Sequence, residues 1–171
     1  TTASLSEFRA NQSRYIAAAQ REPVAILSRG AERRAVLVSP ELFDQAMQAL
    51  EDQIDLAAAR EAESEERVSM EEVREMISFQ RDEPVTRAYK VEFARSAAKS
   101  LSKIDRTEAQ RIYRAIDNLA TNPEPPGSTQ LVGGDGQRRI RVGDYRVIYR
   151  VEHGVLVVFV IRVAHRREVY G

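Results

Sequence analysis

Cysteine and tryptophan are absent from the 171-residue sequence, and histidine occurs only twice. Without cysteine, the chain cannot form disulfides, thiolate nucleophiles or the usual structural zinc sites. Because neither histidine lies in a cluster of carboxylates, we expect no metal site and no other cofactor. The longest apolar run, residues 155–161, suits one buried strand and is too short to cross a membrane. The N-terminus shows no basic region followed by an apolar segment, so we predict a soluble cytoplasmic protein without a signal peptide.

Charge is distributed unevenly along the chain, although 26 Lys and Arg balance 26 Asp and Glu. Residues 1–50 are nearly neutral. Residues 51–84 contain four Arg against twelve Asp and Glu, a net charge of −8, and residues 85–171 have a net charge of +7. An acidic run is usually a solvated surface or a disordered tail. Here a basic segment of similar magnitude follows it, which favours electrostatic contact between the two segments.

The first fifty residues predict the element order αββα. A capping-box pattern at residues 4–7 predicts a helix that begins near Leu5. Residues 24–28 and 35–38 predict two strands. Ser39-Pro40 supplies an N-cap and a first-position proline, so the next helix should begin there.

Three segments of this region are S-E-F-R-A-N-Q-S (6–13), I-L-S-R-G (26–30) and A-V-L-V-S-P-E (35–41). Their order and spacing, with the charged tail that follows, resemble the Phd/YefM antitoxin family. In that family the N-terminal part dimerises and binds operator DNA, and the tail wraps the toxin. The resemblance therefore implies a homodimer formed through residues 1–50, as a symmetric operator requires. Arg9 and Arg29 match the family's DNA-contacting positions, and Asn11 and Arg14 join them from the polar face of the first helix; otherwise each would be an ordinary solvated residue.

The second half, which begins after Pro84, predicts the order βααβββ. Residues 88–93 alternate as an edge strand, and two amphipathic helices follow within 94–120. Three closing strands at 137–142, 145–151 and 155–163 are joined by hairpin turns. The whole chain is thus expected to be α+β, with domains at 1–50, 51–84 and 85–171.

The closing strands contain V-G-D-Y-R-V-I-Y-R-V (142–151), L-V-V-F-V-I-R-V (156–163) and H-R-R-E-V-Y (165–170). These motifs, in this order at hairpin spacing, closely resemble the RelE toxin family over residues 86–171. RelE-type toxins cleave mRNA in the ribosomal A site with basic residues and a C-terminal tyrosine on the sheet. Position by position, the resemblance implies a site of Arg139, Arg141, Arg146, Arg166 and Tyr170. The sequence departs from the family pattern with arginine where lysines often stand, at 139 and 141, and with His165 beside the matched Arg166.

The chemistry of RNA cleavage explains the need for such residues. Attack of a ribose 2′-OH on the adjacent phosphate builds negative charge that guanidinium groups stabilise. A second group must take the 2′ proton and a third must protonate the leaving oxygen. Arginine is a poor base because its pKa is above ~12. Proton transfer is therefore expected to involve Tyr170, which could also stack on a base, or His165, whereas Arg146 and Arg166 contact the phosphate.

The acidic segment is expected to inhibit this site. We predict that residues 51–83 lie across the sheet of 137–163 as helices joined by extended chain, with Asp and Glu contacting the arginines. Its apolar anchors should be Ile54, Val68, Val73, Met76 and Ile77.

Two other functions remain open. ParE toxins share the fold but inhibit DNA gyrase by binding it, without RNA cleavage. Alternatively, the chain is a DNA-binding autorepressor whose basic half has lost activity.

Overall fold

The structure is a computed structural model that describes residues 1–80 and 87–169. The chain forms two compact units, unit 1 (Thr1–Leu50) and unit 2 (Glu51–Gly171). The acidic segment thus belongs to the same unit as the second half of the sequence. Within the described ranges, none of the helices is both long enough and apolar enough to span a bilayer.

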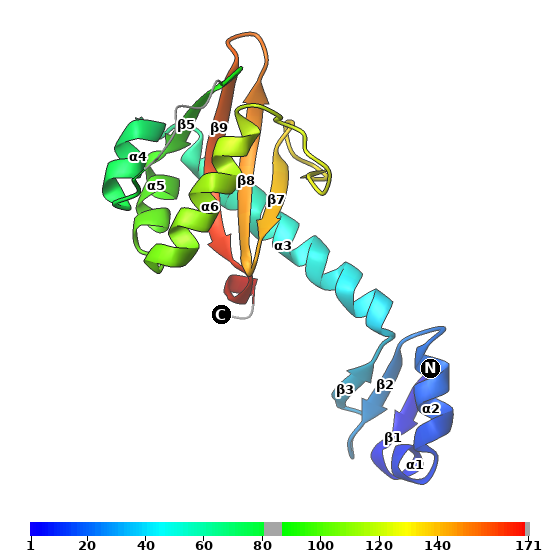
Figure 1. Cartoon of the computed structure of the whole chain (residues 1–171). Helices are drawn as coiled ribbons and strands as arrows, with labels where there is room; N and C mark the ends of the chain where they lie inside the picture. Colours follow the sequence, from blue (N-terminus) through cyan, green and yellow to red (C-terminus); the bar gives the residue numbers. More distant parts are fainter. Residues whose placement is uncertain (81–86, 170–171) are drawn as a thin grey trace. The chain divides into compact units, whose positions relative to one another are not determined.

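Unit 1 contains a three-stranded sheet and helices (Figure 1). Its strands are β1 (Thr2–Ser4), β2 (Val24–Leu27) and β3 (Arg33–Leu37), and its helices are α1 (Leu5–Ala10), α2 (Gln12–Ala19) and the start of α3 (Pro40–Ala62). The predicted capping box is confirmed, because the Ser4 hydroxyl accepts from the Glu7 amide while the Glu7 carboxylate accepts from the Ser4 amide. The first residue of α3 is Pro40, as predicted, and the Ser39 hydroxyl accepts from the amide of Leu42.

Two features of unit 1 differ from the sequence expectation. The expected single helix is broken at Asn11, whose backbone (φ −137°, ψ 43°) leaves the helical region and separates α1 from α2. Strand β1 was not expected, because three residues are too few to show an alternating pattern. It pairs in parallel with β2 and places Ala3 in the small core of this unit.

Unit 2 is built on a six-stranded sheet with the order β4-β5-β9-β8-β7-β6. The strands are β4 (Arg67–Ser69), β5 (Lys90–Ala94), β6 (Thr129–Gln130), β7 (Arg138–Val142), β8 (Tyr145–Glu152) and β9 (Val157–His165). The strands β7 to β9 form the two predicted hairpins, and β5 pairs in parallel with β9. The expectation that β5 is an edge strand is wrong in this chain. Strand β4, from the acidic segment, pairs antiparallel with it and becomes the edge.

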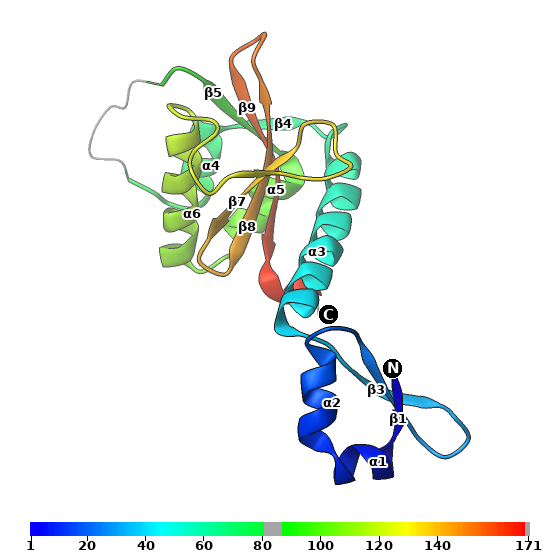
Figure 2. The same ribbon diagram turned by 90° about the vertical axis from the view of Figure 1, so that its right-hand side faces the viewer.

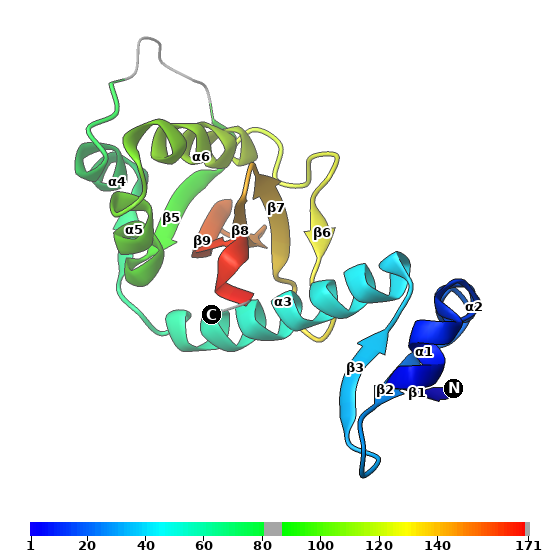
Figure 3. The same cartoon turned by 90° about the horizontal axis from the view of Figure 1, so that it is seen from below.

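Helices cover both faces of this sheet (Figures 2 and 3). One face packs against α5 (Arg95–Ser102) and α6 (Arg106–Leu119), with α4 (Met70–Met76) beside α5. Val147, Tyr149 and Val160 are among the fully buried residues of the main core, which also includes α5 and α6 side chains. The other face meets the second half of α3. A 3₁₀ helix, η1 (Arg166–Val169), follows β9. The α+β fold predicted for the chain is confirmed.

Candidate functional site

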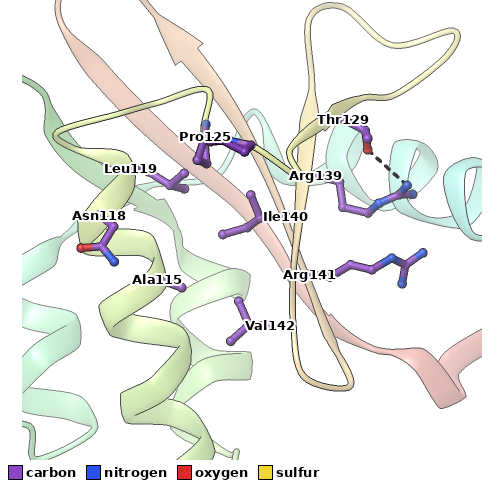
Figure 4. A pocket seen from close by; sticks show the side chains of 11 residues that line it. Ala115, Asn118, Leu119, Pro125, Thr129, Arg139, Ile140, Arg141 and Val142 are labelled. Carbon is purple, nitrogen blue, oxygen red and sulfur yellow. Dashed lines mark hydrogen bonds between the residues drawn. The ribbon is translucent and has the colours of Figure 1, made fainter.

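One face of the sheet in unit 2 carries a group of arginines, called the arginine face below. Because side chains alternate along a strand, residues 139 and 141 of β7 share a face, and Arg141 pairs across the strands with Arg146 of β8. Figure 4 shows the alternation: Ile140 and Val142 point toward α6, whereas Arg139 and Arg141 point the opposite way. The members of the arginine face are Arg139, Arg141, Arg146, Arg150 and Arg162.

The second half of α3 places carboxylates against this face. Residues three and four apart lie on one side of a helix, and residues 51, 52, 55, 59, 62 and 63 follow this spacing. Leu56, Ala59 and Ala62 on this side are buried in the core. The acidic partners are Glu51 for Arg141 (2.7 Å), Asp52 for Arg139 and Glu63 for Arg150.

Asp55 forms the centre of this contact. Arg146 donates from Nε and Nη2 to the two oxygens of Asp55, at 2.8 and 2.9 Å, and both side chains are fully buried. Arg162 of β9 donates from Nε to Oδ1 of the same carboxylate at 3.0 Å. Burial by itself lowers the pKa of Arg146, but the hydrogen bonds and charge of Asp55 outweigh it, and the pKa is raised. One buried carboxylate therefore compensates two guanidinium groups.

Asp55 was not among the residues expected to matter. Its signal in the sequence is its position, because it lies one turn beyond Glu51 and directly before Leu56 at helical spacing. An aspartate within an apolar stripe of a helix needs a buried cationic partner. The sequence alone could not name which of the many arginines that partner is.

The residues proposed for catalysis do not all lie together. Arg139, Arg141 and Arg146 share the arginine face and are held by the acidic segment. The Arg166 side chain is 61% exposed and lies 3.5 Å from Asp144 in the β7–β8 turn.

The remaining two candidates lie at the end of the chain. The ring of His165 packs edge-on against Tyr145, with 4.9 Å between ring centroids, and its carbonyl accepts from Nη1 of Arg146 at 3.1 Å. Tyr170 lies outside the described residues.

A second contact joins the acidic segment to the edge of the sheet. Arg67 of β4 donates to Glu152 at 2.6 and 3.2 Å and to Glu92 at 3.2 Å. Its guanidinium lies 3.8 Å from the ring centroid of Phe159, which is fully buried. Hydrogen bonds to Glu152 raise the pKa of Arg67, and those same bonds lower the pKa of the Glu152 carboxyl. In this contact the acidic segment supplies the cation and the rest of unit 2 supplies the carboxylates, the reverse of the arrangement at the arginine face.

The predicted apolar anchors of the acidic segment have mixed outcomes. Val68, Val73 and Ile77 are buried in the main core, and Ile54 is half-buried. Met76, by contrast, is 43% exposed. It lies roughly a quarter turn away from the buried side of α4. Besides Asp55, the described part of this segment buries four apolar residues that were not expected as anchors, which are Leu56, Ala59, Ala62 and Met70.

The residues proposed for DNA binding are all exposed on unit 1. Arg9 lies in the last turn of α1, Asn11 separates the two helices, and Arg14 lies in α2 with its guanidinium 5.8 Å from the ring of Tyr15. Arg29 lies in the turn between β2 and β3. Exposed cations and an amide on one small unit are compatible with contacts to phosphate and bases.

A pocket of about 450 Å³ lies on the other side of β7 (Figure 4). Its walls are largely apolar and come from α6, the loop at Pro125 and Pro126, and Ile140 and Val142 of β7. The arginine head groups point away from it. Arg139 and Arg141 are nevertheless among its lining residues, so the pocket adjoins the arginine face across β7.

Two family models match different parts of the chain, and the first match includes most of the acidic segment. Residues 1–75 match the model of "Antitoxin Phd_YefM, type II toxin-antitoxin system", and residues 91–170 match that of "ParE toxin of type II toxin-antitoxin system, parDE". No curated protein matches the chain.

Similar solved structures include toxin–antitoxin complexes. The RelE–RelB complex of Pyrococcus horikoshii OT3 has 27% identity and covers 46% of this chain and 96% of that chain, with a TM-score of 0.42. The intact RelBE complex of E. coli has 26% identity, coverages of 46% and 96%, and a TM-score of 0.42. RelBE2 of Mycobacterium tuberculosis has 26% identity, coverages of 46% and 98%, and a TM-score of 0.37. From the two family matches, the chain is a type II toxin–antitoxin module in which a Phd/YefM-type antitoxin sequence and a ParE/RelE-type toxin sequence follow one another in one polypeptide.

Proposed function

We propose that residues 85–171 are a ribosome-dependent mRNA endonuclease that residues 51–84 of the same chain hold inactive. The observation that carries this proposal is the pairing of the arginine face with the carboxylates of α3. Guanidinium groups that bind a row of carboxylates have the donor geometry that a phosphate backbone requires. A helix covering those groups excludes a second polyanion from the same face.

The proposed roles combine the positions of the described residues with the sequence resemblance, which alone supplies Tyr170. Arg146 binds the reacting phosphate and stabilises its developing charge, and Arg139 and Arg141 bind neighbouring parts of the RNA. Tyr170 and His165 are the groups proposed for proton transfer or base stacking, and Arg166 supplies a further cation at the end of β9. Because Arg146 is buried under α3 in the intact chain, activity requires this helix to leave.

The test compares full-length chains in a translating extract. An Asp52→Asn/Asp55→Asn chain, whose acidic segment is weakened, should cut mRNA in the ribosomal A site, and the unchanged chain should not. Adding Arg146→Ala or Tyr170→Phe should abolish cutting. The Glu61→Gln chain is a matched control, because Glu61 lies on the exposed side of α3. Absence of cuts from the weakened chain and from residues 85–171 alone would refute the nuclease function.

A gyrase inhibitor is the second candidate, because the family model that matches residues 91–170 is that of ParE toxins. Inhibition of DNA supercoiling by the weakened chain, without mRNA cuts, supports this function. The arginine face favours the nuclease, since binding to a protein surface does not need several cations around one anion site.

We also propose that residues 1–50 form a homodimer. This dimer binds operator DNA and represses transcription of the module's own gene. We propose the cytoplasm as the location of the protein. The support is a group of apolar side chains that the four-residue buried core of this unit leaves exposed. The exposed apolar residues are Leu5, Ile16, Val36, Leu42, Phe43 and Leu50. A second copy would bury such a surface.

The DNA-binding residues are tested by a matched pair of variants. Arg9→Ala/Arg29→Ala should lose binding to the DNA upstream of the gene. Arg21→Ala/Arg34→Ala removes the same charge outside the proposed set and should retain most binding. Equal loss in both variants would mean that net charge, and not these positions, determines binding. Sedimentation of Phe43→Glu should show a monomer if this surface forms the dimer.

A further inference from the structure

The buried carboxylate of Asp55 occupies a site with the features of an oxyanion-binding site. Three N–H groups from two guanidinium groups converge on it, at 2.8, 2.9 and 3.0 Å. Arg146 approaches with the Nε–Nη2 edge, which is the arrangement that binds two oxygens of a carboxylate or a phosphate side by side. The Asp55 oxygens thus stand in for two oxygens of an anion.

Each arginine of this site also has a partner that does not belong to the acidic segment. Arg146 donates from Nη1 to the carbonyl of His165 at 3.1 Å. Arg162 donates from Nη2 to Glu168 at 2.6 Å, and Glu168 in turn accepts from the backbone amide of His165 at 3.2 Å. None of these partners belongs to α3, so we expect the contacts to remain when α3 leaves. The donor edges that faced Asp55 therefore stay oriented toward a vacated site.

The two cations differ from the pair that the sequence favoured. From the sequence, Arg146 and Arg166 were expected to contact the phosphate, and Arg162 was not among the expected site residues. In the structure Arg166 contacts Asp144 in the β7–β8 turn, whereas Arg162 reaches the same carboxylate oxygen as Arg146.

We propose that Arg162 and Arg146 together form the phosphate-binding site of the toxin domain, and that Asp55 occupies it in the intact chain. The ligand class is a phosphodiester or an inorganic phosphate anion. The inference rests on the proposed nuclease function for its biological ligand, because that function supplies an RNA phosphate. The anion site itself can be tested without any nuclease activity.

The test vacates the site in the full-length chain and offers inorganic phosphate. Asp55→Ala removes the carboxylate and leaves both arginines. Phosphate should then raise the unfolding temperature of unit 2 saturably, whereas the unchanged chain should show no saturable rise. Glu63→Ala is the matched control, because it removes a carboxylate that contacts one partly buried arginine, Arg150, and the amide of Gln137. That variant should resemble the unchanged chain.

The role of Arg162 is decided by double variants. Asp55→Ala/Arg162→Gln should bind phosphate about tenfold or more weakly than Asp55→Ala, because one charge-assisted donor is lost. Asp55→Ala/Arg166→Gln should bind as Asp55→Ala does. Equal affinity in the Arg162 double variant, or loss in the Arg166 double variant, would overturn the assignment.

Two further outcomes are distinguishable. If Asp55→Ala is unfolded without added anion, phosphate should restore its folding, and failure to do so overturns the site. If phosphate binds as expected but the translating extract shows no mRNA cuts, the anion site stands and the nuclease function falls. Cuts that are as fast in Asp55→Ala/Arg162→Gln as in Asp55→Ala overturn the site and leave the nuclease function in place.

Discussion

Replacing Asp55 by Asn should be the most damaging single conservative change in the acidic segment. The amide has nearly the same shape as the carboxylate but no charge, and its NH₂ group faces guanidinium N–H groups with which it cannot bond. Arg146, fully buried, would lose its anionic partner. Arg162 would retain Glu168.

The magnitude follows from burial. Breaking a buried ion pair by removing one partner costs about 3–5 kcal/mol, because a charge remains without compensation. We expect this range for Asp55→Asn. By contrast, the side chains of Glu63 and Arg150 are 29% and 24% exposed, so Glu63→Gln should cost about 1 kcal/mol or less.

The measurement is urea unfolding of the full-length chain at neutral pH. All tyrosines except Tyr15 lie in residues 51–171, so tyrosine fluorescence reports mainly on unit 2. The same Asp55→Asn change is also made in an Arg146→Met background. In that background Asp55→Asn should lower the free energy of unfolding by less, since the buried charge of Arg146 that Asp55 compensates is absent.

Two results would refute this reasoning. One is a loss below about 1 kcal/mol for Asp55→Asn, which would mean that water or another group compensates Arg146. The other is an unchanged cost in the Arg146→Met background, which would locate the effect of Asp55 outside the ion pair.

Two other predictions concern the same segment. Met70→Ala should destabilise unit 2 by about 2–5 kcal/mol, because Met70 is buried, whereas Met76→Ala in the same helix should change stability by about 0.5 kcal/mol or less; calorimetry of both variants checks the difference. Arg67→Gln should cost about 1–2 kcal/mol at pH 7 and less at pH 3. The reason is that Arg67 lowers the folded-state pKa of Glu152, so this contribution is present above the ordinary glutamate pKa of about 4.3 and is lost as pH falls through the lowered value. Unfolding curves at the two pH values that show an equal cost would contradict it.

Most helices and strands of unit 2 were predictable, because the residue patterns that indicate them lie within each segment. Alternation in 138–142 and 145–151 determines which face each side chain takes, so Arg139, Arg141 and Arg146 were expected on one surface. The apolar spacing of α5 and α6 similarly predicts the side that packs on the sheet. These patterns need no knowledge of distant residues.

Arg162 of β9 could not be assigned to a face by the same reasoning. Val158 and Val160 lie on the side of α5 and α6, and strict alternation from them would turn Arg162 to that side as well. The register shifts between Ile148 and Tyr149 of β8, and β9 gains one residue there. Beyond the bulge, Arg162 lies on the arginine face. A bulge has no signature in this sequence, so its consequence could not be foreseen.

The three residues of β4 were missed for a different reason. Their strand conformation depends on the edge of β5, a non-local partner that the sequence does not indicate. Asp55 belongs to the same class, because its importance comes from two arginines about a hundred residues away in sequence. Contacts between the two halves are therefore what the structure adds to the sequence.

Inhibitor and toxin belong to one chain. The fraction of molecules in which α3 has left the arginine face, called the open fraction, should therefore depend on the free energy of the contact between α3 and that face and not on protein concentration. Each 1.4 kcal/mol lost from the contact raises the open fraction about tenfold, so a cost of about 3–5 kcal/mol at Asp55 corresponds to a rise of roughly a hundredfold to a few thousandfold. Specific mRNA cleavage by Asp55→Asn should therefore exceed that of Glu63→Gln by at least about tenfold, and both should stay constant on dilution. Specific activity that rises on dilution would contradict this, because it would show that acidic segments inhibit toxin domains of other copies.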